Sequence, residues 1–135
     1  DVDEIWNPEV KVDIEPNNVY RYIQSARPFY LNNKSNQSIN GWTGTRVGLF
    51  ETLKKYGPNH FRTEREITSI PVENGGWHFS WLSKNKDKWG DNHPDNHNRF
   101  VKAMNCVIQK DETGLPKYII ENKEKYKKLF IQYNK

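Results

Sequence analysis

The stretch that decides the fold lies at residues 73–82 and reads ENGGWHFSWL. From Trp77 onward it alternates large apolar side chains with a histidine and a serine, which is typical of a β-strand with one buried face. The glycines just before Trp77 permit positive φ angles or a close approach between backbones. We therefore expect a turn at residues 73–76 and a strand over residues 77–82.

Strands and short helices are also expected before this stretch. Aromatic and β-branched residues favour an extended structure over residues 19–31, although Pro28 disfavours a central, fully paired strand there. A helix over residues 51–56 is expected to stop at Gly57 and Pro58. The other expected elements are a buried strand ending within residues 1–5, a strand over 45–50, a helix over 59–65 capped by Asn59, and a short strand over 67–72.

After residue 82 the pattern changes from extended to helical. Residues 83–98 are dense in Asn, Asp, Lys and His and are expected to form a long loop. Apolar residues at three- and four-residue spacings predict helices over residues 97–110 and 117–133. Strands followed by C-terminal helices indicate an α/β or α+β protein with a mixed sheet.

The composition limits the class of protein. The chain has 135 residues, the length of one domain or of a piece of a larger one. Its 21 Lys and Arg residues outnumber 17 Asp and Glu, but they are spread along the chain, so we expect no nucleic-acid partner. No apolar run approaches the roughly 20 residues that cross a bilayer, so no membrane span is expected. The single cysteine, Cys106, excludes an intrachain disulfide framework and a Cys-rich zinc site.

The chain opens on an acidic motif. Residues 1–5 read DVDEI, and because they begin inside a motif we expect the sequence to be the C-terminal part of a longer domain. At a strand end alternate residues share a face, so Asp1 and Asp3 can point the same way. Two converging carboxylates suit a hard divalent cation, which prefers oxygen ligands. A solvated acidic turn would give the same pattern.

Tryptophans flank a histidine in the strand that the opening stretch predicts. Trp77 and Trp81 on either side of His78 would form a flat, polarisable wall, and sugars bind such walls through their C–H faces. Gly75 and Gly76 would let a ligand approach the backbone closely. A core strand with a buried, hydrogen-bonded histidine would give the same sequence.

The long polar loop contains residue types that bind metals. Asp91, His93, Asp95 and His97 lie within seven residues of one another. Their spacing fits no specific zinc pattern. A polar surface loop without a metal is the alternative.

The segment at residues 42–46 reads WTGTR and contains a candidate phosphate ligand. Its glycine allows close approach, and the guanidinium of Arg46 can hold a phosphate in a fork. A loop-to-strand junction with an exposed arginine is the alternative.

Taken in order, these motifs resemble glycosyltransferase family 17, the β-1,4-mannosyl-glycoprotein 4-β-N-acetylglucosaminyltransferases with their bacterial and viral relatives. The resemblance spans nearly the whole chain. The segments that carry it are Asp1-Val2-Asp3-Glu4-Ile5 with Asn7-Pro8-Glu9, Phe29-Tyr30-Leu31-Asn32, Trp42-x-Gly44-Thr45-Arg46, Gly75-Gly76-Trp77-His78-Phe79-Ser80, Asn96-His97-x-x-Phe100, and Leu115-Pro116-Lys117-Tyr118 with Glu121-Asn122.

The resemblance implies a GT-A fold, of which this chain would be a C-terminal portion or a single domain. It implies an inverting mechanism, a nucleotide-sugar donor such as UDP-GlcNAc, a glycan acceptor, and Mn²⁺ or Mg²⁺ as cofactor. Asp1 and Asp3 match the family's Asp-x-Asp motif, whose last Asp binds the metal in GT-A enzymes. His97 best matches the histidine that often completes the metal sphere, and His93 is second.

The resemblance also implies roles in catalysis and substrate binding. Inverting transfer needs a base that deprotonates the acceptor hydroxyl. Glu73 lies where many GT-A enzymes carry this carboxylate, with Asp91 and Asp95 as alternatives. The residues expected to bind substrate are Trp42, Arg46, Gly75, Gly76, Trp77, His78 and Trp81.

The expected compartment is the cytoplasm of a bacterial or viral system rather than the Golgi lumen, because the chain has a single cysteine. Three rival functions use the same residues. A non-catalytic carbohydrate-binding module would need the tryptophans but not the acidic motif. A nucleic-acid reader would use stacked aromatics with Lys and Arg. A metal-dependent hydrolase would use His93, His97 and the nearby acids.

Overall fold

The computed structural model describes residues 3–35, 44–63, 67–80, 82 and 108–130. The chain divides into two compact units. The first unit comprises Asp1–Ser25 and Asn40–Trp77, and the second comprises Ala26–Ile39 and His78–Lys135. The expectation of a single domain, or of the C-terminal part of a larger one, stays a prediction.

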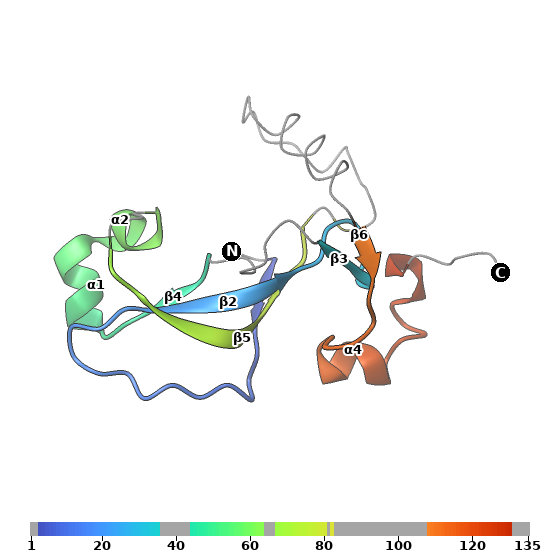
Figure 1. Cartoon of the computed structure of the whole chain (residues 1–135), viewed down its shortest axis with the longest axis horizontal. Coiled ribbons are helices and arrows are strands. Elements are labelled where there is room, and N and C mark those ends of the chain that lie inside the picture. The colour runs from blue at the N-terminus through green and yellow to red at the C-terminus, as the bar shows by residue number, and fades with distance from the viewer. Residues whose placement is uncertain (1–2, 36–43, 64–66, 81, 83–107, 131–135) are drawn as a thin grey trace, which may run out of the picture. The chain divides into compact units, whose positions relative to one another are not determined.

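A four-stranded sheet is the main element of the fold (Figure 1). Its strands, in spatial order, are β1 (Glu4–Trp6), β5 (Ile70–His78), β2 (Tyr20–Ala26) and β4 (Arg46–Val47). β2 pairs with β4 antiparallel.

β2 and β5 run in the same direction. The amide of Ile70 donates to the carbonyl of Val19, and further along both strands the amide of Arg27 donates to the carbonyl of His78. A parallel pair needs a long crossover connection, usually one that contains a helix. Here the crossover contains α1 (Phe50–Tyr56) and α2 (Pro58–Thr63). The mixed sheet with helices confirms the predicted α/β character.

A small apolar core joins the two helices to the residues that precede β2 and β5. Buried Val19, Phe61 and Ile67 form its centre, and Leu53 and Tyr56 pack against them. α1 ends where the sequence predicts, because Gly57 adopts a φ of 75° and its amide caps the carbonyl of Leu53. The predicted cap is wrong for α2: Pro58 takes its first position, and Asn59 lies inside the helix.

The predicted turn at residues 73–76 is wrong. β5 continues through these residues and ends at His78, so the strand predicted over residues 77–82 is the end of a longer one. Asn74 and Gly76 adopt positive φ angles of 54° and 139° within the strand. Such angles are typical of a bulge, which accommodates glycine without ending the pairing.

Three other predicted strands also change. β1 begins at Glu4 and exposes Ile5 and Trp6, so the prediction of a buried strand ending within residues 1–5 is wrong. The strand predicted over residues 45–50 is confined to β4, because α1 already begins at Phe50. The strand predicted over 19–31 ends at Ala26. The chain then turns at Phe29, which has a φ of 69° and is fully buried.

The second unit contains a two-stranded antiparallel sheet of β3 (Asn33–Ser35) and β6 (Ile108–Lys110). The predicted helix over residues 97–110 is therefore wrong for its last residues, and its other residues lie outside the described part. The predicted helix over 117–133 is also too long. It is α4 (Lys117–Glu121), then turns, then the short 3-10 helix η3 (Lys127–Leu129).

A buried arginine organises the second unit. Arg27 is 1% exposed, and its guanidinium donates to the backbone carbonyls of Leu31, Asp111 and Thr113. Its Nη2 atom also lies 3.8 Å from the Asp111 carboxylate. Burial lowers the pKa of Arg27, and the charge of Asp111 opposes this shift. The arginine thus joins the segment after β2 to the segment after β6.

None of the described helices is long and apolar enough to cross a membrane.

Candidate functional site

The structure describes part of the predicted site. Asp3, Arg46, Glu73, Gly75, Gly76 and Trp77 belong to the first unit, and His78 begins the last segment of the second. The predicted site residues that lie outside the described part are Asp1, Trp42, Trp81, Asp91, His93, Asp95 and His97.

The acidic motif and the glycine motif meet where β1 pairs with β5. The amide of Asn7 donates to the carbonyl of Gly75 over 3.1 Å, and its side-chain Nδ2 donates to the carbonyl of Asn74 over 3.1 Å. A Cβ atom on Gly76 would lie 2.0 Å from the carbonyl oxygen of Ile5. The backbones therefore approach closely only because residue 76 is glycine.

A hydrogen-bond chain joins the acidic motif to the segment containing Arg46. The hydroxyl of Thr45 donates to the carboxylate of Glu4, and Nε2 of Gln24 donates to the Thr45 hydroxyl over 3.1 Å. Gln24 is 1% exposed, and its Oε1 atom has no hydrogen-bond partner in the described part. A buried acceptor in this position can receive a hydrogen bond from a bound water or ligand.

Arg46 is tied to the helical side of the first unit. It is half-buried, and its Nη1 atom donates to the backbone carbonyl of Phe61 over 3.1 Å. This bond fixes the direction of the side chain. Its predicted contact with a phosphate stays a prediction.

Of the two tryptophans that the structure describes, Trp6 and Trp77, the exposed one was not predicted as a site residue. Trp77 is 9% exposed, so its ring offers little surface to a sugar. Trp6, which the motif reading missed, is 52% exposed and stacks on Tyr22 with ring centroids 5.6 Å apart. The exposure of Trp6 depends on which strand pairs with β1. That strand is far away in the sequence, so the residues around Trp6 do not reveal it. The only sequence signal was its position directly after Ile5.

Asp3 is the predicted metal ligand that the structure describes. It is half-buried and precedes β1, so the acidic motif starts a strand rather than ending one. Among the described residues no group of three or more His, Cys, Asp or Glu side chains could hold a metal ion. The carboxylate of Asp3 fits a hard divalent cation in its chemistry, as one ligand of a set.

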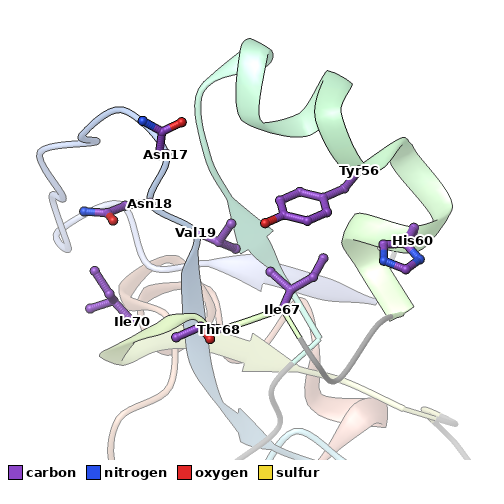
Figure 2. A pocket seen from close by; sticks show the side chains of 8 residues that line it. All are labelled: Asn17, Asn18, Val19, Tyr56, His60, Ile67, Thr68 and Ile70. Atoms are coloured by element: carbon purple, nitrogen blue, oxygen red, sulfur yellow. The ribbon is translucent and has the colours of Figure 1, made fainter.

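A pocket of about 420 Å³ lies apart from the predicted site residues, at the edge of the small apolar core (Figure 2). Figure 2 shows the Tyr56 ring reaching toward Val19, and Tyr56 also stacks on His60 with centroids 6.1 Å apart. The lining residues are Asn17, Asn18, Val19, Tyr56, His60, Ile67, Thr68 and Ile70. These described lining residues include no carboxylate and no primary amine.

Comparison of the chain with protein-family models, with curated proteins and with solved structures found no match. The function of the site is therefore inferred from the described geometry and from the sequence motifs.

Proposed function

We propose that this chain is part of an inverting, metal-dependent glycosyltransferase with a GT-A-like fold. It transfers GlcNAc from UDP-GlcNAc to a hydroxyl of a glycan. The observation that supports this proposal is the convergence of three motif segments that are far apart in the sequence. The acidic motif, the Thr45-Arg46 segment and the glycine motif meet in the first unit, through the Glu4–Thr45 hydrogen bond and the pairing of β1 with β5.

The proposed chemistry assigns a role to each segment. Glu73 is exposed on β5 and acts as the base that takes the proton from the acceptor hydroxyl. Asp3, together with Asp1, would hold Mn²⁺ or Mg²⁺, and the resemblance implies His97 or His93 as a further ligand. When bound, the cation would neutralise negative charge on the diphosphate of the donor. Arg46 binds a phosphate of the donor.

The first experiment is a calorimetric titration of UDP-GlcNAc into the chain, with and without Mn²⁺. We expect binding only with Mn²⁺. The Asp3→Ala variant should weaken this binding at least about tenfold, because a hydrogen-bonded or ligating charge is worth about 1.5–3 kcal/mol. Asp13→Ala is the matched control, since Asp13 is an exposed aspartate in the same unit and lies outside the acidic motif.

Two outcomes would contradict the proposal. Equal affinity of the wild type and Asp3→Ala for UDP-GlcNAc would contradict the metal-binding role of the acidic motif. Equal affinity with and without Mn²⁺ would contradict the metal-dependent mechanism. In a transfer assay, Glu73→Gln should abolish turnover while leaving donor binding unchanged, because the amide cannot take a proton.

A non-catalytic carbohydrate-binding module is the second candidate. The exposed Trp6 ring favours it. Such a module would bind free sugar, would not bind UDP-GlcNAc, and would keep its sugar affinity in the Asp3→Ala variant.

A further inference from the structure

The indole ring of Trp6 forms a platform across three strands. β5 lies between β1, which carries Trp6, and β2, which carries Tyr22. The rings of Trp6 and Tyr22 nevertheless stack, with an interplanar angle of 15°. They meet because Gly75 on the middle strand has no side chain. A Cβ atom there would lie 2.6 Å from Cβ of Tyr22.

The platform has a fixed base and an open surface. Tyr22 is 6% exposed, so it is anchored in the sheet and holds the Trp6 ring by stacking. The Trp6 side chain is 52% exposed, and its indole N–H has no hydrogen-bond partner among the described residues. The exposed ring can therefore accept a flat ligand without rearrangement of the sheet.

Two exposed polar side chains precede Gly75 on the middle strand. Glu73 and Asn74 are exposed on β5, two positions and one position before Gly75. Neither side chain has a hydrogen-bond or ion-pair partner among the described residues. An aromatic face with a carboxylate and a carboxamide beside it has the chemistry of a carbohydrate site, because a pyranose has an apolar C–H face and hydroxyls around its rim.

We infer that Trp6 is an acceptor subsite, on which one pyranose ring of the glycan stacks beside Glu73. This inference rests on the proposed function, since it places the accepting sugar next to the proposed base. A neutral sugar fits better than an anionic one, because the neighbouring Glu73 carboxylate would repel a negative ligand.

The test is a titration followed by the indole N–H resonances of the chain's five tryptophans. The probe is N,N′-diacetylchitobiose, added without nucleotide or metal. The Trp6 resonance is assigned as the one missing in Trp6→Phe. Sorbitol is the control ligand, because it has hydroxyls but no ring face. We expect the Trp6 resonance to shift with chitobiose and not with sorbitol.

Variants distinguish sugar binding to the Trp6 ring from binding elsewhere on the surface. Trp6→Ala should weaken chitobiose binding about five- to tenfold, the range expected for loss of an aromatic stacking contact. Trp6→Phe should retain most of the affinity, which also shows that the sheet folds without the indole. The matched control is Tyr118→Ala, which removes a similarly exposed aromatic ring, 55% exposed, from the second unit.

Three results would overturn the inference. They are an unshifted Trp6 resonance, equal affinity of Trp6→Ala and wild type, or a Trp6 resonance that changes with protein concentration instead of sugar. The last result would assign the surface to a second copy of the chain. The UDP-GlcNAc titration with Mn²⁺ is independent of all three, so failure of this subsite and failure of the transferase proposal are distinguishable.

Discussion

At the scale of the single residue, Asp111 stabilises the second unit through its charged form. Its carboxylate accepts hydrogen bonds from the hydroxyl and the amide of Thr113, and lies 3.5 Å from the Lys34 amine and 3.8 Å from Arg27. The Thr113 hydroxyl contributes most to lowering the pKa of Asp111, and the two cations act in the same direction. The carboxylate is therefore bound more tightly as an anion in the folded chain.

This shift gives the stability of the chain a defined dependence on pH. Because the pKa is lowered by folding, the contribution of Asp111 is fully present above the unfolded pKa, about 3.9, and is lost as the pH falls through the folded value. Asp111→Asn should destabilise the chain by about 1.5 kcal/mol at neutral pH. The difference should shrink below about pH 4. Urea unfolding at several pH values measures it, with Asp13→Asn as the exposed control. A difference that does not change with pH would contradict this account.

At the scale of the element, the pairing of β1 with β5 depends on Gly76. Its φ is 139°, which L side chains rarely adopt, and a Cβ would meet the carbonyl oxygen of Ile5 at 2.0 Å. Gly76→Ala should therefore lower the free energy of unfolding by about 3 kcal/mol or more, which is a larger loss than backbone strain at a positive φ causes by itself. Gly114→Ala is the matched control, because Gly114 has a φ of 64° but nothing within 4 Å of its would-be Cβ.

The two glycine variants separate backbone strain from steric overlap. Gly114→Ala should cost about 1–2 kcal/mol, the penalty of a left-handed conformation. Equal losses of stability in the two variants, measured by chemical denaturation, would show that the contact with Ile5 contributes nothing.

Element boundaries that depend on residues close in the sequence were predictable. α1 ends at Gly57 as expected, because the cap is a local interaction. The glycine pair in β5 was predicted as a turn, since nothing local to it reveals that β1 pairs alongside. The helix predicted through residue 110 fails at Ile108–Lys110 for the same reason, because β3 provides the partner strand.

The candidate site shows the same division. The residue types of the acidic and glycine motifs indicated the segments that the structure brings together in the first unit. Burial could not be predicted, because it depends on how the strands are ordered. Trp77, which was expected to contact a sugar, is consequently buried, and Trp6, for which the motifs predicted no role, is exposed.

At the scale of the whole molecule, each unit has its own stabilising centre. The first unit is held where Asn7 on one segment pairs with Gly75 on another. The second is held by Arg27, whose guanidinium bonds the carbonyls of Asp111 and Thr113. Contiguous regions of a protein can open separately when their stabilising contacts are separate. The two centres can therefore be weakened one at a time.

Hydrogen exchange resolves whether the units open separately. The reporters are the amide of Asn7, bonded to Gly75, and the amide of Asp111, bonded to the Asn32 carbonyl over 2.8 Å. Arg27→Met leaves buried carbonyls without donors and should speed exchange at Asp111 by about a hundredfold, with little change at Asn7. Gly76→Ala should do the reverse. Equal acceleration of both amides in both variants would mean that the chain opens as one cooperative body, since a single opening reaction would then expose both reporters.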